Sequence, residues 1–320
     1  MKKTGIVIGA AAAGTAAAAS VEIFFRNFIC RREPERWEER EKRKGTHWVQ
    51  TVPLIRESQK WLKEQETEQV FMHSFDGLTL QGTFLPAKGE SDRVVLAVHG
   101  YMGTGENNYC VMARFLHENG YHVLIVDDRA HGRSEGAYNG FGCLDKEDCY
   151  RWVHYLNRRF EGKCSIFLHG ISMGAATVLM AAGLNLPPAV RGIVGDCGFT
   201  SPREEFLHMV HSRKIIGGRI VLKLAEPLCR RRAGYGFSDY SASEAVTRTK
   251  IPVFIIHGAE DRYVPTRMGR EIYQACASKK RLWIVSGAAH AESYYVAKQE
   301  YEKKMLQFFE DCLKDCGHEK

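Results

Sequence analysis

The chain has 320 residues, of which 44% are hydrophobic and 26% charged. These proportions are typical of a globular protein, and the length suits one large α/β domain. The net charge is +7, but basic residues are interleaved with acids, and the densest basic cluster, Arg230 to Arg232, has no interspersed aromatic residues. This excludes a nucleic-acid platform built on base stacking. An anionic membrane surface matches the charge better.

The ten cysteines are dispersed along the chain. None forms a C-x-x-C pair or shows the spacing of zinc ligands, so the sequence predicts no metal site and no disulfide framework. This many cysteines without a framework indicate a reducing compartment.

Residues 1–29 begin with two lysines and continue as a mostly apolar run. The run is long enough to cross a bilayer as a helix, so we expect a single-pass N-terminal membrane anchor. Lysine and arginine are denser after the run than before it, which places the rest of the chain in the cytoplasm, at the cell membrane. The alternative is a cleaved signal peptide followed by secretion, because "AAAAS" (16–20) offers small-residue cleavage sites.

Residues 30–66 are highly charged up to about Lys44 and show helical spacing near Pro53 to Glu66. They predict a linker followed by an amphipathic helix. Two alternating runs then flank Asp76-Gly77, which predicts a β-hairpin.

Six short apolar runs follow, rich in Val and Ile and closed by Gly, Asp or His: 92–100, 121–129, 164–172, 190–198, 251–259 and 280–288. Stretches of helical spacing lie between most of them. Buried strands that alternate with helices predict an α/β domain over 67–318, with a mostly parallel central sheet covered by helices on both faces. Ligands bind such sheets at the carboxyl ends of the strands, so the polar residues after each run are candidates for one site.

The alternation breaks once, between 201 and 250, where helical patterning continues without a strand. This stretch is too long for a simple crossover, and we interpret it as a helical cap inserted before the penultimate strand. An extra pair of surface helices is the alternative.

Ser172 stands in "LHGISMGA", at the end of an apolar run and before a helical one. G-x-S-x-G in that context is typical of a nucleophile elbow, in which the flanking glycines make room for a tight turn. A serine nucleophile needs a base, and His290 follows the last apolar run. The base needs an acid, and Asp261 follows the penultimate run; Glu260 and Asp196 are rivals for that role.

An acyl-transfer site also needs two donors for the developing oxyanion. The N–H of Met173, directly after the serine, is one candidate. The N–H of Tyr101, in the loop after the first parallel strand, is the other. In "DDRAHGRS" (127–134), Asp128, Arg129 and His131 are candidates for a polar network below the site, and His131 is a weaker candidate for the base.

The motifs "HGYMG", "DDRAHGRS", "GISMG", "HGAEDRYVP" and "GAAHAES", in this order, resemble the α/β-hydrolase superfamily. "GDCGFTSPREEF" and "RAGYGFSDYSASEAV" are similar to a group of N-terminally anchored bacterial α/β-hydrolases whose substrates are mostly unassigned. The resemblance implies Ser172 as nucleophile, Asp261 as acid, His290 as base, and the backbone of Tyr101 and Met173 as oxyanion hole.

The expected function is therefore hydrolysis of a small carboxylic ester by a serine, a histidine and an aspartate, with no cofactor. A peptidase or amidase would use the same residues, and so would an acyltransferase. A non-catalytic, membrane-tethered binding protein is a further alternative. The sequence indicates neither the substrate nor the oligomeric state.

Overall fold

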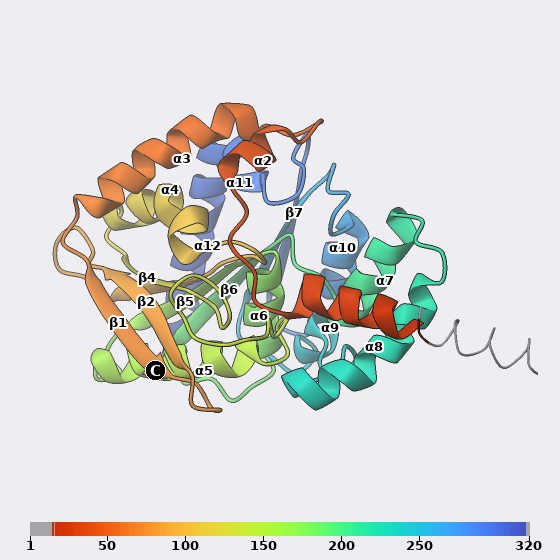
Figure 1. Ribbon diagram of the computed structural model, residues 1–320. Coiled ribbons are helices and arrows are strands. Elements are labelled where there is room, and N and C mark those ends of the chain that lie inside the picture. Colours follow the sequence, from red (N-terminus) through yellow and green to blue (C-terminus); the bar gives the residue numbers. More distant parts are fainter. Residues whose placement is uncertain (1–14, 16, 318–320) are drawn as a thin grey trace, which may run out of the picture.

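The computed structural model describes residues 15 and 17–317 of the chain (Figure 1). Its centre is a sheet of eight strands in the order β1-β2-β4-β3-β5-β6-β7-β8. The strands are β1 (Glu68–His73), β2 (Thr79–Leu85), β3 (Arg93–Val98), β4 (His122–Val126), β5 (Ser165–Ile171), β6 (Val190–Asp196), β7 (Val253–Gly258) and β8 (Lys280–Val285).

The six apolar runs form β3 to β8, which pair in parallel and confirm the predicted sheet. Every residue of β7 is buried, as expected for a strand covered on both faces. β1 and β2 form the predicted antiparallel hairpin, whose turn contains Gly77 at a φ of +88°. β1 alternates exposed and buried residues, since one of its faces meets solvent.

Helices cover both faces of the sheet (Figure 1). One face is covered by α5 (Asp145–Arg159), α6 (Met173–Ala181) and α10 (Thr266–Ala275). The other is covered by α4 (Gly105–Glu118), α11 (Ser293–Val296) and α12 (Lys298–Gly317), with α3 (Trp48–Lys63) packed on α4. The carboxyl edge of the sheet is thereby left as the place where loops from several strands meet.

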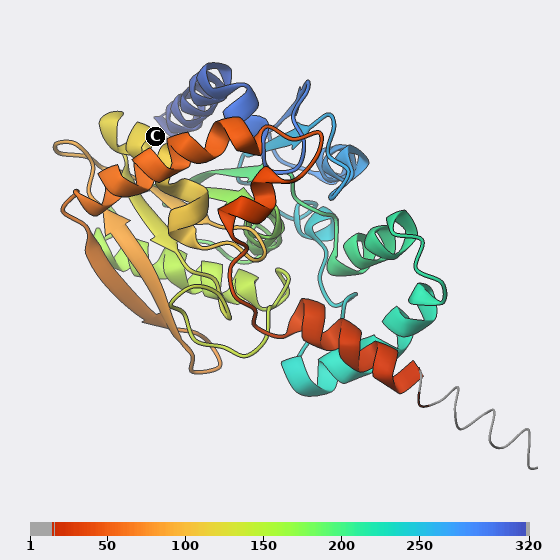
Figure 2. The same cartoon turned by 45° about the horizontal axis from the view of Figure 1, so that its top comes forward.

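Three helices lie between β6 and β7: α7 (Pro202–Ser212), α8 (Gly218–Ala233) and α9 (Ala242–Ala245). We call residues 201–250 the insertion. α9 packs against α6 and α10, whereas α7 and α8 pack on each other and extend to one side of the domain (Figures 1 and 2).

Residues 17–48, here called the N-terminal segment, fold against the domain. A helix runs through residues 17–24 into a π-helical turn, η1 (Phe25–Ile29), and lies beside α8 (Figures 1 and 2). The Phe24 ring lies edge-on 5.2 Å from that of Phe206 in α7. Further along, after the short α2 (Trp37–Glu41), the backbone N–H of His47 donates to the buried Glu292 carboxylate at 2.7 Å.

Part of the segment predicted to cross a membrane, residues 1–14 and 16, lies outside the described residues. Within the described part of the chain, no helix combines the length and the apolar character that a bilayer span requires. The described part of the predicted anchor buries Val21, Phe24, Phe25 and Ile29 in the protein core.

Phe25→Ala is expected to lower the free energy of unfolding by about 3 kcal/mol, because it leaves a cavity in a packed core. The Phe25 side chain is 1% exposed, and its ring lies 5.4 Å from that of Tyr138 and under the guanidinium of Arg232. Ile23→Ala, two residues away at a 60% exposed position, is the matched control and should change stability by less than about 0.5 kcal/mol. Chemical denaturation measures both, and equal losses would contradict the packing of this segment.

Candidate active site

Ser172 lies at the turn between β5 and α6, in a strained backbone conformation with φ of 56° and ψ of −115°. The glycines beside it are required by close backbone contacts. A Cβ at Gly170 would lie 2.2 Å from the carbonyl oxygen of Gly174, and one at Gly174 would lie 2.1 Å from that of Val98. The turn therefore has no room for a side chain at positions 170 and 174, and it lifts the serine hydroxyl above the carboxyl edge of the sheet.

Ser172, His290 and Asp261, which come from three different strand ends, are brought together. Ser172 Oγ lies 2.8 Å from His290 Nε2, and His290 Nδ1 lies 2.7 Å from Asp261 Oδ2. Backbone N–H groups of Tyr263 and Val264 donate to the other carboxylate oxygen, Asp261 Oδ1, each at 2.9 Å. Asp261 is thus fixed in orientation and faces the imidazole.

Burial by itself would raise the pKa of Asp261. The neighbouring His290 and His257, through charge and hydrogen bonds, outweigh burial and hold the pKa of Asp261 well below its ordinary value. The carboxylate therefore stays ionised at neutral pH and acts only as an acceptor. It follows that Nδ1 of His290 carries a proton and that Nε2 is available to accept the hydroxyl proton of Ser172.

The loop after β3 passes close to Ser172. A Cβ on Gly100 would lie 3.2 Å from the Cβ of Ser172, so this backbone runs directly past the serine. The N–H of Tyr101 follows in that loop, and the N–H of Met173 is the first of α6, where a helix has no internal acceptor for it. Neither N–H makes a hydrogen bond to another residue in the described ranges.

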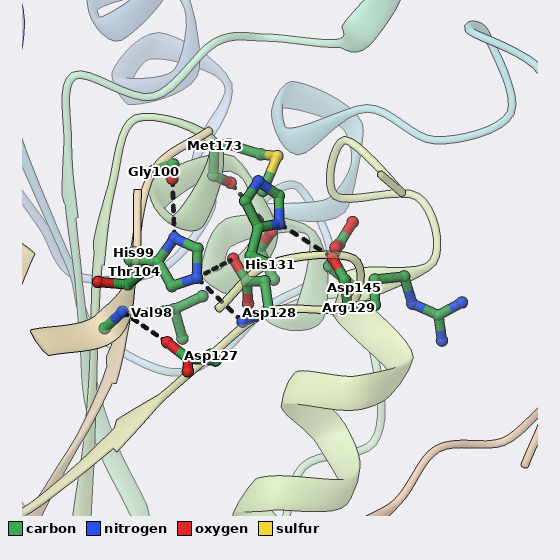
Figure 3. Close-up of polar contacts among 12 residues, drawn as sticks. Val98, His99, Gly100, Thr104, Asp127, Asp128, Arg129, His131, Asp145 and Met173 are labelled. Carbon is green, nitrogen blue, oxygen red and sulfur yellow. Dashed lines mark hydrogen bonds and ion pairs between the residues drawn. The ribbon is translucent and has the colours of Figure 1, made fainter. Parts of the chain in front are cut away.

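Two buried histidines hold this loop (Figure 3). His99 Nδ1 donates to the carbonyl of Gly100 at 2.7 Å, and its Nε2 accepts from the N–H of Asp128. His131 Nδ1 donates to the carbonyl of Arg129 at 2.9 Å, and its Nε2 accepts from the N–H of Met102. Burial, together with the neighbouring His99, lowers the pKa of His131 to about 3. With both nitrogens engaged, His131 braces the loop and is not placed to act as a base.

The other two candidates for the acid role, Asp196 and Glu260, are not hydrogen-bonded to His290. Asp196 accepts from the hydroxyl of Ser293 at 3.0 Å, and burial raises its pKa to about 6. Glu260 is exposed and lines an outer cavity beside His290. Only Asp261, of the three candidates, forms a hydrogen bond with His290.

Known proteins resemble this chain in sequence and in fold. Residues 89–230 match the family Hydrolase_4, described as serine aminopeptidase, S33. The esterase Pf2001 of Pyrococcus furiosus superimposes with a TM-score of 0.64 at 23% identity, covering 79% of this chain and 93% of that one. The chain has the α/β-hydrolase fold. The family match makes it an enzyme of the hydrolase class.

Two curated proteins are also similar to the hydrolase in sequence. YqkD of Bacillus subtilis is 27% identical over 225 residues, 70% of this chain and 73% of that protein. The lysophosphatidylserine lipase ABHD12 of Danio rerio is 27% identical over 205 residues, 60% of this chain and 49% of that protein.

Ser172 and His290 open into a cavity of about 100 Å³, part of whose wall comes from the N-terminal segment. The wall includes Glu35, Arg40 and Arg43, with Glu35 accepting from both arginines. Residues 30–66 were predicted to form a charged linker and a helix, with no part in the site. A charged stretch without periodicity carries no local signal of what it contacts.

His257, at the end of β7, was also missed. Its Nε2 lies 2.9 Å from the carbonyl of Val264 and 3.4 Å from Asp261 Oδ2, the carboxylate oxygen that His290 also contacts. The sequence signal that could have identified His257 is its place near the end of a predicted strand, four residues before Asp261.

One group of side chains in the described ranges could offer ligand atoms to a metal: Cys197, Asp261 and His290, within 4.8 Å of one another. Asp261 and His290 already share a hydrogen bond, and burial raises the pKa of Cys197 well above its ordinary value. A protonated thiol is a poor metal ligand, so the arrangement favours the hydrogen-bonded chain over a metal centre.

Proposed function

We propose that the protein is a serine hydrolase that cleaves carboxylic esters through an acyl-enzyme, with Ser172 as nucleophile, His290 as base and Asp261 as acid. The observation that carries the proposal is the continuous chain of hydrogen bonds from Ser172 Oγ through His290 to Asp261. It has the geometry that an activated serine requires.

The reaction follows from these positions. Ser172 Oγ attacks the ester carbonyl while His290 Nε2 takes the hydroxyl proton, and the resulting imidazolium faces the ionised Asp261. The N–H groups of Tyr101 and Met173 stabilise the oxyanion. His290 returns the proton to the departing alcohol, leaving an acyl group on Ser172. Water then attacks the acyl group by the same route and releases the acid. No cofactor enters any step.

Ester substrates are supported by the names of similar proteins, an esterase and a lysophosphatidylserine lipase. An amide substrate is the second candidate, because the matched family is described as a serine aminopeptidase. Paired substrates with one acyl group, one as ester and one as amide or aminoacyl-anilide, distinguish the two. We expect turnover of the ester only.

Labelling with a fluorophosphonate, followed by peptide mapping, tests the nucleophile. The expected result is a single adduct on Ser172 in the wild-type protein and no adduct in the folded His290→Ala variant. An adduct on another serine, or labelling that does not depend on His290, would contradict the proposed roles.

His257 is expected to act as a positioning residue through Asp261. His257→Leu removes the donor beside the carboxylate and should lower kcat about 10-fold or more, as loss of a supporting partner does elsewhere, with KM nearly unchanged. His257→Gln keeps an N–H near the same place and should restore most of kcat. A purely structural role would instead lower both variants' thermal stability together, without the difference in kcat.

A further inference from the structure

The insertion exposes an apolar surface on the side of the domain where α7 and α8 meet. Its members are Ile215 and Ile216 in the α7–α8 loop and Ile220 and Leu224 on α8, with exposed fractions of 47%, 100%, 63% and 47%. Aliphatic side chains exposed together in this way mark an interaction surface more often than an ordinary solvated one.

This surface is separate from the packing face of α8. The inner face of the helix buries Leu222, Ala225 and Cys229. Ile220 and Leu224 are four residues apart and so share an outer stripe of the helix. A Cβ on Gly218 would lie 2.3 Å from Val210, so the first turn of α8 is pressed onto α7 and the intervening loop is turned outward. The apolar residues are therefore presented by a packed scaffold.

Basic residues surround the apolar ones. Arg213, Lys214, Arg219 and Lys223 are exposed, and no acidic residue occurs between 206 and 225. None of these four cations has an ion-pair partner among the residues that the structure describes. Exposed aliphatic side chains ringed by unpaired cations match a bilayer that contains anionic lipid, in which both kinds of side chain gain favourable contacts.

Two neighbours of this surface also favour a lipid occupant. The helix of residues 17–24 begins at the same end of the molecule as the α7–α8 loop (Figures 1 and 2). The chain preceding it reads "MKKTGIVIGAAAAG", two lysines followed by mostly apolar residues. Arg213 also lines the outer cavity beside His290, together with Arg43, Lys44 and Arg262. The mouth of the candidate active site thus adjoins the surface.

We propose that residues 213–224 form a docking surface for an anionic lipid bilayer, which places the mouth of the active site at the lipid interface. The surface does not depend on the chemistry proposed for Ser172, so the two proposals can fail separately.

The first test places an environment-sensitive fluorophore at Ile216→Cys in the full chain, with labelled wild type as background. Vesicles of phosphatidylcholine with about 25% phosphatidylglycerol should shift the emission to the blue and raise its intensity, and pure phosphatidylcholine should do so less. Phe71→Cys, on the edge strand β1 and 60% exposed, is the matched control and should not respond.

The second test measures vesicle binding by co-sedimentation. Ile216→Ser with Ile220→Ser, and separately Lys214→Glu with Lys223→Glu, should each weaken binding about tenfold or more. Lys163→Glu, at a 79% exposed side chain, is the charge control and should bind normally. Hydrolysis of a short soluble ester should be the same in all of these variants, which separates this proposal from that for the catalytic residues.

Three outcomes would overturn the proposal. If the emission of the fluorophore at position 216 does not change although the protein binds the vesicles, another part of the chain contacts the lipid. A lipid-independent signal that grows with protein concentration would assign the surface to a second copy of the chain. Absence of binding to either kind of vesicle would exclude a lipid bilayer as the ligand of this surface.

Discussion

Replacement of Ser172 by alanine is expected to lower kcat/KM on an ester substrate by about 10⁴- to 10⁶-fold, the loss seen when a serine nucleophile is removed elsewhere. The variant loses the only atom that attacks the carbonyl, while the oxyanion donors and the binding cavity remain. Its thermal stability should match that of the wild-type protein, since the hydroxyl forms its described side-chain hydrogen bond with the partly exposed His290.

Initial rates across a range of substrate concentrations measure this loss. Ser212→Ala, at an exposed position near the end of α7, controls for the preparation and should keep full activity. A Ser172→Ala protein that is folded and retains more than about one hundredth of the activity would overturn the role given to this serine.

Glu205→Gln is expected to stabilise the protein at neutral and alkaline pH. Glu205 lies on α7, is 3% exposed, and neither of its carboxylate oxygens has a hydrogen-bond partner in the described part of the chain. Burial, reinforced by the nearby charge of Asp261, raises the pKa of Glu205 to about 8. Glutamine has nearly the same shape and no charge to bury.

The direction of this stability difference follows from the pKa of Glu205 in the folded protein and in the unfolded chain. The unfolded chain releases this proton near the ordinary pKa of glutamate, whereas the folded protein holds it up to about pH 8. The folded state is therefore favoured below the ordinary pKa and loses this advantage as the pH rises towards 8. At pH 7 the wild-type protein should be less stable than Glu205→Gln by about 3 kcal/mol, with little difference near pH 4.

Urea denaturation of both proteins at a series of pH values measures the difference, and the other titrating groups cancel in the comparison. Glu204→Gln, the neighbouring and partly exposed position, should show no such pH-dependent gain. A constant difference across the series would mean that Glu205 does not titrate as burial requires.

Sequence patterns predicted the sheet well because each buried strand carries its own local signature. The apolar runs that form β3 to β8 also predicted which polar residues lie close together. Ser172, Asp261 and His290 each follow one of these strands. Their separation along the chain was no obstacle, because a parallel sheet collects its carboxyl ends at one edge.

Other parts of the site could not be predicted in this way. Arg43 and Glu35 reach the cavity from a charged stretch without periodicity. His257 contacts Asp261 from within an apolar strand, where it is indistinguishable from a packed core residue. The burial of Glu205 depends on how α7 lies against the loop of Asp261, a tertiary relation that amphipathic spacing does not encode.

The docking of the N-terminal segment depends on residues that lie far along the chain. Glu22 pairs with Arg232, and the backbone of His47 pairs with Glu292, 245 residues further on. During synthesis the N-terminal segment precedes both partners in the chain, so its partner surface is complete only after Glu292 has left the ribosome. Contacts so distant in sequence form slowly. The cavity beside Ser172 is therefore lined in part by a segment that precedes the sheet in sequence, and this wall is held in place by a residue that follows the last strand.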